Sequence, residues 1–237
     1  MALTRVLITV KTYPTLSETH TELVCTAGFR EDGTMIRIYP VPFRMLNEYQ
    51  KYKKYQWISI DLKRRSRDFR PESYSPVDID KGFELQEVID NKHYDLRRSI
   101  VLKHVCYNMS ELIKESKQED NYKSLAVVKP KEILDFYWKS DAKEWDSGKL
   151  KKIKARSFQG SLFEEHTPID FNLVRKVPYR FYYRFTTDDN IERNMMIEDW
   201  EVGVLYWNMM DTYHNEEMAC QKVKDKFYHE FIKRDLY

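Results

Sequence analysis

The sequence predicts an α+β protein in which a small N-terminal β-barrel precedes a mixed C-terminal region. Four short strand patterns with tight turns fill the first 62 residues, and the clearest helical stripe lies between residues 212 and 233. About 42% of the 237 residues are hydrophobic, which is enough for a core at this length. We expect a barrel-like domain at residues 1–80 and a mixed α+β region, closed by two helices and packed on it, at 81–237.

The barrel is predicted from apolar or alternating runs. Residues 5–10 and 22–27 form the first two strands, and the Asp-Gly pair at 32–33 indicates a hairpin turn because this pair tolerates a positive φ. A third strand covers 35–39, and residues 55–62 alternate as a half-buried strand does. Together they indicate a small OB-like or PUA-like barrel.

The C-terminal region mixes both patterns. Residues 140–156 are polar and poorly periodic, which predicts a mobile loop or linker. Residues 83–89 are ambiguous between helix and strand. We expect strands at 98–103, 125–128 and 179–186, and helices at 110–117, 130–138, 197–210 and 212–233.

The composition limits the function. The formal net charge is only +2, so no global field draws the protein to nucleic acid, and local charge matters more. The three cysteines, Cys25, Cys106 and Cys220, are widely spaced and form no Cys-x-x-Cys pair, which fits a reducing compartment. No apolar run approaches the length of a membrane span, and the N-terminus carries no signal peptide. We therefore expect a cytoplasmic protein without a membrane partner.

No motif indicates a cofactor or a metal. The chain has six glycines, and they form neither a dinucleotide fingerprint nor a phosphate loop. The six histidines form no zinc-binding pair; His104 and Cys106 lie two apart on a predicted strand, but two ligands are not a site. We expect neither a cofactor nor a bound metal.

A first candidate binding surface lies between residues 26 and 44. In a small barrel, arginines and aromatic side chains on one face give bases a stacking platform and phosphates a positive charge. The alternative is that the rings pack under a loop and the arginines only solubilise the surface. The candidates are Arg37, Tyr39, Phe43 and Arg44.

A second candidate is the stretch from residue 51 to residue 70, which holds eight basic and two acidic residues. Aromatic side chains interleave with these charges, a pattern typical of a nucleic-acid groove. The alternative is a solvated loop, and the same alternative applies to the basic run at 149–156. The candidates from this stretch are Trp57, Arg64, Arg65, Arg67 and Arg70.

Two carboxylates are the candidates for catalysis. Glu72 lies in Arg70-Pro-Glu-Ser-Tyr74, where Pro71 restricts Arg70 to extended backbone and leaves Glu72 close enough to pair with an arginine. Asp199 belongs to an acidic cluster between residues 188 and 201, where a helix N-terminus offers a purely structural explanation. Either carboxylate beside the basic groove could serve as a general base.

These features give three hypotheses. The first is a module that binds single-stranded or non-canonical DNA or RNA. The second is an enzyme acting on a nucleotide or base, such as a glycosylase or nuclease. The third is a subunit that buries exposed aromatic side chains against a protein partner.

Two family resemblances add to this interpretation. Val24-Cys-Thr-Ala-Gly28, followed by Ile36-Arg-Ile-Tyr-Pro-Val41, resembles the opening of the dual OB-containing domain family, with Met35 where that family has tryptophan. The motifs at 11–14, 36–44, 70–74, 129–135 and 199–203 resemble an uncharacterised bacterial family, which implies a bacterial defence or mobile-element setting. That family carries a Cys/Gly-His knuckle where this chain has residues 186–194 without such ligands, and its members continue beyond the equivalent of residue 237.

Overall fold

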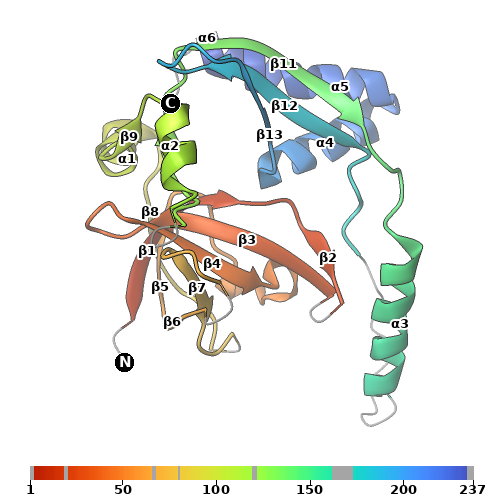
Figure 1. The fold of residues 1–237 in the computed structure, drawn as a ribbon. Coiled ribbons are helices and arrows are strands. Elements are labelled where there is room, and N and C mark those ends of the chain that lie inside the picture. Colours follow the sequence, from red (N-terminus) through yellow and green to blue (C-terminus); the bar gives the residue numbers. More distant parts are fainter. Residues whose placement is uncertain are drawn as a thin grey trace.

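The computed structural model describes residues 3–18, 21–65, 68–79, 81–118, 122–161 and 173–233. It has a strand-rich N-terminal part and, above it in Figure 1, a smaller sheet backed by helices. The predicted α+β class, with a barrel-like sheet first and helices closing the C-terminal part, is confirmed.

The N-terminal part is a curled, half-barrel sheet. Seven strands follow the order β6-β7-β4-β3-β1-β5-β8, and β2 pairs with β3 beside this path. The strands are β1 (Thr4–Lys11), β2 (Thr15–Ser17), β3 (Thr21–Phe29), β4 (Met35–Val41), β5 (Gln56–Ile60), β6 (Leu62–Arg64), β7 (Ser73–Pro76) and β8 (Glu84–Val88). Alternate side chains such as Val6, Ile8, Ile36 and Ile38 are fully buried in the concave core. The four predicted strands are confirmed.

The outer face of this sheet is covered at one end by helix α1 (Tyr94–Val101). Leu7 and Trp57 point outward from β1 and β5 and pack with Ile89 and Ile100. The predicted strand at 98–103 is wrong, because the Asp90 carboxylate caps the preceding turn and Ile100 is held as part of a helix. β8 follows the expected domain boundary at residue 80 and pairs with β5.

The C-terminal part is a three-stranded antiparallel sheet in the order β11-β12-β13, with helices on one face (Figure 1). Phe136, Phe181, Tyr206 and Val223 are buried between sheet and helices. The elements are β11 (Glu132–Ser140), α3 (Ser147–Ser161), β12 (Tyr179–Thr186), β13 (Arg193–Met196), α4 (Trp200–Tyr213), α5 (Glu216–Lys224) and α6 (Phe231–Lys233). The strand at 179–186 and the helix at 197–210 are confirmed.

Three predictions in this part need correction. Residues 130–138 were expected to be helical, but β11 pairs with β12 along its whole length, and this pairing overrides the proline signal. Within the predicted loop at 140–156, α3 begins at Ser147, because the Asp146 carboxylate accepts the Lys149 backbone N–H at 2.8 Å. The helix predicted from residue 212 begins at Glu216, since His214 is left-handed and Asn215 caps the new helix.

Short elements lie between the two parts. β9 (Val105–Cys106) pairs in parallel with β10 (Val127–Val128), and α2 (Met109–Glu115) lies between them in the chain. The helix expected at 110–117 and the strand expected at 125–128 are confirmed in short form. Together these elements place residues 103–118 and 122–128 over the side of the N-terminal sheet that carries β4 and β7.

The two parts are joined at the end of β1. The Tyr13 backbone N–H donates to the Glu198 carbonyl at 2.9 Å, and the Tyr13 ring lies against Gly203 of α4. The Lys11 ammonium is 4.2 Å from the Phe43 ring centroid and 5.0 Å from that of Trp200. Burial lowers the pKa of Lys11, and the neighbouring rings partly offset the cost of burying its charge.

Candidate nucleic-acid interface

An arginine-rich surface occupies the outer face of β3, β4 and the β6–β7 connection. Because Ile36 and Ile38 point into the core, Arg37 and Tyr39 point to the opposite side. The Arg65 guanidinium lies 4.9 Å from the centroid of the Tyr39 ring. We call the set formed by Cys25, Arg37, Tyr39, Arg65 and Arg70 the arginine face.

Positive charge on the arginine face is only partly neutralised. Asp68 makes a bidentate hydrogen bond with Arg70, at 2.7 and 2.6 Å, and lies 3.8 Å from Arg65. The hydrogen bonds with Arg70 hold the pKa of Asp68 well below its ordinary value. Arg37 makes no ion pair with the described residues, and its buried Nε has no hydrogen-bond partner among them. The Asp68 carboxylate therefore offsets part of the positive charge of Arg65 and Arg70, and the charge of Arg37 has no such partner among the described residues.

The pKa of the Cys25 thiol is affected by the same positive charges of the arginine face. Burial raises its pKa, and the guanidinium groups of Arg37, Arg70 and Arg65 act in the opposite direction. Three arginines thus act on one side chain, Arg37 from β4 and the other two from the connection between β6 and β7. The fold brings together charges that are separated in the sequence.

The arginine face borders a cleft between the two parts of the molecule. A cavity of about 590 Å³ is lined by Cys25 and Tyr39 below and by Met196 of β13 above. A second cavity, of about 570 Å³, is lined by Arg70 and by Met195, the neighbouring residue of β13. We call these two cavities the interdomain cleft; Cys25, Tyr39 and Arg70 of the arginine face line it. Figure 1 shows β13 descending toward β3 and β4.

Three predicted binding residues lie elsewhere. Phe43 is 6% exposed and packs edge-to-face on Tyr52 in the core. Trp57 is 7% exposed beneath α1, with the Arg5 guanidinium over its ring. Arg44 donates to both carboxylate oxygens of the buried Glu22 at 2.7 Å. These side chains are engaged in the fold, and the two rings offer no face to a base.

The remaining basic candidates are divided. Arg64 donates to the Pro71 carbonyl at 2.9 Å, apart from the arginine face. Arg67 lies outside the described residues. The basic run at 149–156 lies on α3, where Lys152 pairs with Glu18 at 3.0 Å. Four of the nine predicted binding residues, Arg37, Tyr39, Arg65 and Arg70, therefore belong to the arginine face.

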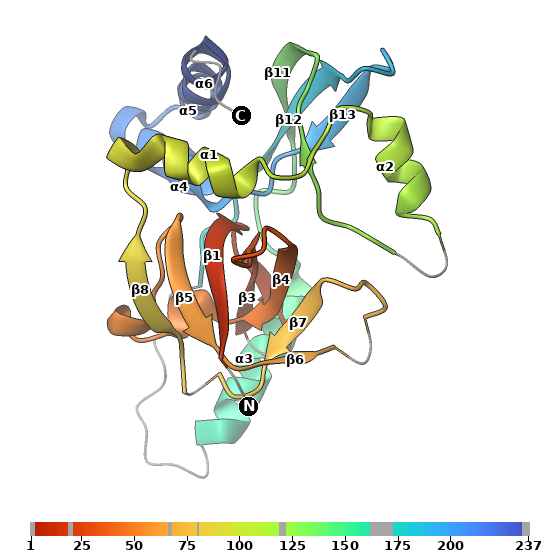
Figure 2. The same cartoon turned by 90° about the vertical axis from the view of Figure 1, so that its left-hand side faces the viewer.

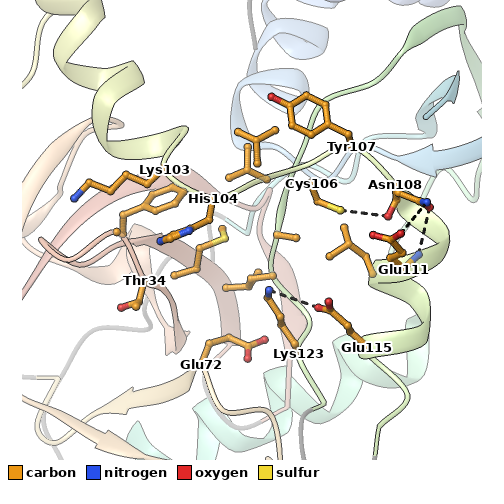
Figure 3. Close-up of a pocket in the computed structure, with 18 of the residues that line it drawn as sticks. Thr34, Glu72, Lys103, His104, Cys106, Tyr107, Asn108, Glu111, Glu115 and Lys123 are labelled. Atoms are coloured by element: carbon orange, nitrogen blue, oxygen red, sulfur yellow. Dashed lines mark hydrogen bonds and ion pairs between the residues drawn. The ribbon is translucent and has the colours of Figure 1, made fainter. Parts of the chain in front are cut away.

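Of the two predicted acids, Glu72 lies in the wall of a third cavity (Figure 3), which has a volume of about 970 Å³. Its side chain is buried and does not pair with Arg70. Glu72 Oε1 accepts hydrogen bonds from the backbone N–H and the hydroxyl of Ser124, whereas its buried Oε2 has no partner among the described residues. Because this cavity joins the two parts of the chain, we call it the junction cavity.

Asp199 has structural partners instead. It caps α4 by accepting the Glu201 backbone N–H at 2.9 Å, and it pairs with Lys54 at 3.0 Å. Burial tends to raise its pKa, but the hydrogen bond with Glu201 and the Lys54 ammonium leave the pKa lowered. The Asp199 carboxylate is therefore already engaged in capping α4 and in the ion pair with Lys54.

The part of the chain that the structure describes contains no group of three His, Cys, Asp or Glu side chains placed to hold a metal. None of its helices is long and apolar enough to cross a membrane.

The sequence did not indicate Lys103 or Lys123 in the junction cavity, nor Ser124 as the partner of Glu72. Ser124 and Glu72 are 52 residues apart in the sequence, and no local sequence pattern predicts the hydrogen bond between them. The one available signal was the spacing of His104 and Cys106, which were predicted to share one face of a strand; in the structure His104 precedes β9, and both side chains line this cavity.

Two family models match the chain and meet where the two parts meet. Residues 2–103 match a domain of unknown function (DUF8758), and residues 105–237 match another (DUF8757). Since the second match covers more than half of the sequence, the chain belongs to the DUF8757 family. No curated protein and no solved structure matches the chain.

Proposed function

We propose that the protein binds an unpaired stretch of nucleic acid in the interdomain cleft. The observation that carries the proposal is the Arg65–Tyr39 stack beside Arg37 and Arg70, on a face that borders open cavities. Unpaired strands are held by cations that follow the backbone and by flat groups on which bases stack. A duplex needs no stacking surface, so this arrangement favours single strands.

Local charge supports the proposal despite the small net charge of the chain. Arg37 has no carboxylate partner among the described residues, and Arg65 and Arg70 share Asp68. Arginine suits this role because its planar group donates to phosphate and also stacks on rings. If Arg37, Arg65 and Arg70 each meet one phosphate, the logarithm of the affinity should fall with the logarithm of salt with a slope of about −2.

The test is fluorescence anisotropy with labelled single-stranded DNA and RNA between about 50 and 200 mM salt. Arg65→Ala and Arg70→Ala should each weaken binding and reduce the slope by about 0.7. Arg175→Ala is the matched control, because Arg175 stacks on Trp207 at 3.6 Å, pairs with Asp211 and lines neither cavity of the cleft. Absence of binding to either strand at low salt would overturn the proposal.

The same experiment addresses the two alternatives. Cleavage of the strand or release of a base would favour an enzyme, with Glu72 as the remaining candidate acid. A protein-interaction role would rest on Phe69, which is 79% exposed and lies 6.5 Å from the Tyr122 ring. Phe69 adjoins Arg70 in the cleft, so this apolar surface has a basic neighbour and fits nucleic acid better.

A further inference from the structure

The junction cavity has the size and lining of a small-molecule site. Its volume of about 970 Å³ lies at the upper end of the range for ligand pockets. Phe29, Met35, Leu112 and Val127 form apolar walls, and polar side chains converge on the space between them (Figure 3). Both family regions contribute to the lining, so the cavity exists only when they are assembled.

Glu72 defines the chemistry of the cavity. Its side chain is 8% exposed, and its Oε2 is buried without a partner among the described residues. A buried acceptor without a donor costs free energy, so such an atom indicates a missing N–H or O–H donor. Ser124 holds the other oxygen at 2.8 Å from its backbone N–H, which fixes the carboxylate in the wall.

A donor accompanies this acceptor. Lys123, which precedes Ser124, extends into the cavity in Figure 3, and its ammonium lies 3.8 Å from Glu115. Lysine only donates and an ionised carboxylate only accepts. The wall therefore presents a donor and an acceptor to a flat ligand between apolar side chains.

We propose that the junction cavity binds a guanine nucleotide. The guanine edge carries one acceptor, the O6 carbonyl, beside two N–H donors, so O6 faces Lys123 and the N–H groups face Glu72. Adenine offers a single donor group on the corresponding edge and makes one contact fewer with the carboxylate. Lys103 lies on the side of the cavity away from α2 in Figure 3, and Arg30 also lines the cavity. These two side chains are the cations that we assign to the phosphate, and the Lys103 ammonium would have to exchange its bond to the Glu31 carbonyl for one to the phosphate.

The cavity is connected to the arginine face by a short segment. Arg70 lines the interdomain cleft and Glu72 lines the junction cavity, two residues further along the chain. The Arg37 backbone N–H donates to the Glu72 carbonyl at 2.8 Å, so the two sites share one edge of the sheet. This inference rests on the proposed function in one respect: the guanine belongs to the strand that the arginine face holds.

The experiment is isothermal titration of the full chain with GMP, AMP and UMP. We expect GMP to bind most tightly, and Glu72→Gln and Lys123→Met to weaken it about 10- to 100-fold. Lys114→Met is the matched control, because Lys114 is an exposed lysine of α2 that does not line the cavity. If Glu72→Gln fails to fold, Lys123→Met alone decides, since the Lys123 side chain is 45% exposed and does not support the core.

The outcomes separate the two proposals. GMP binding that needs Glu72 and Lys123, without any oligonucleotide binding, would retain the cavity and overturn the strand-binding function. Strand binding that needs Arg65, together with no GMP binding or equal binding by all variants, would overturn the guanine site and retain the strand-binding function.

Discussion

The two sheets of this protein carry arginines in different electrostatic settings. In the C-terminal part, Arg180 pairs with Asp141, Arg184 with Glu192 and Arg193 with Asp189, so no two of these arginines share a carboxylate, although Asp141 also pairs with Lys176. On the arginine face, Arg65 and Arg70 share Asp68, and Arg37 has no acidic partner among the described residues. A chain with a net charge near zero can therefore carry a local excess of positive charge. This local excess, and not the net charge of the whole chain, is the basis of the proposed binding face.

The two sheets also differ in their aromatic side chains. On the C-terminal sheet, Tyr137 and Tyr182 lie opposite each other on paired strands and stack at 5.2 Å with an angle of 11°. Each ring thus covers a face of the other. Tyr39 stacks on an arginine instead and borders a cavity. Four predictions test this contrast, from the largest expected effect to the smallest.

The first prediction concerns the independence of the two cores. Phe136→Ala removes a fully buried ring from the C-terminal core and should cost about 3–5 kcal/mol of stability. Hydrogen exchange should increase in β11, α4 and α5 and remain slow in β1, β3 and β4, because the two clusters are separate. The control Val204→Ala, at a position 37% exposed, should change little. Equal loss of protection in both parts would show that they unfold as one unit.

The second prediction concerns the joint between the two parts. A Cβ at position 203 would lie 2.1 Å from Tyr13 Cδ2, so Gly203→Ala should destabilise the protein by about 1–3 kcal/mol. Thermal unfolding measures this loss. Adding Tyr13→Ala should recover part of the stability, because the ring that causes the clash is gone. Equal stability of Gly203→Ala and the parent would contradict the packing described here.

The third prediction compares two carboxylates. Asp68→Asn removes the one acid shared by Arg65 and Arg70 and should strengthen single-strand binding about fivefold at low salt. Asp141→Asn, which frees Lys176 and Arg180, should leave strand binding unchanged. Anisotropy titrations of the two variants provide the comparison. An equal gain in both would mean that only net charge matters.

The fourth prediction concerns pH. The hydrogen bond from Lys176, followed by that from Arg180, lowers the pKa of Asp141 to about 2. Because the folded pKa is below the ordinary value, this stabilisation is present above about pH 4 and is lost as the pH falls toward 2. Asp141→Asn should cost at most about 1 kcal/mol at neutral pH and reduce the acid-induced loss. Denaturation midpoints at several pH values measure this, and identical pH profiles would contradict it.

The fold was predictable where local patterns decide the structure. The N-terminal strands alternate clearly, and Arg37 and Tyr39 of β4 could be assigned to one face of the strand. The prediction failed where distant contacts decide the structure. β11 is a strand because it pairs with β12, and α1 is a helix that follows the turn capped by Asp90 and packs Ile100 against Leu7 and Trp57. In the candidate site, Arg37, Tyr39, Arg65 and Arg70 were selected by residue type; the structure brings them to one face, and their role in binding stays a prediction. Phe43 and Trp57 were misplaced because aromatic residues serve cores and binding surfaces alike.

The resemblance to the dual OB-containing domain family and the bacterial defence setting stay predictions, since both matching families are domains of unknown function. What the fold adds is the meeting of both family regions around the interdomain cleft and the junction cavity. A strand held in the cleft would contact both regions at once.

The most direct test is ultraviolet cross-linking of a bound single strand, followed by mass spectrometry of the cross-linked peptides. Our account predicts adducts at Tyr39 and Phe69, which border the interdomain cleft. Arg65→Ala should reduce the Tyr39 adduct, since this arginine lies over that ring. Adducts confined to Tyr137 and Tyr182 would place the strand on the C-terminal sheet and contradict the account.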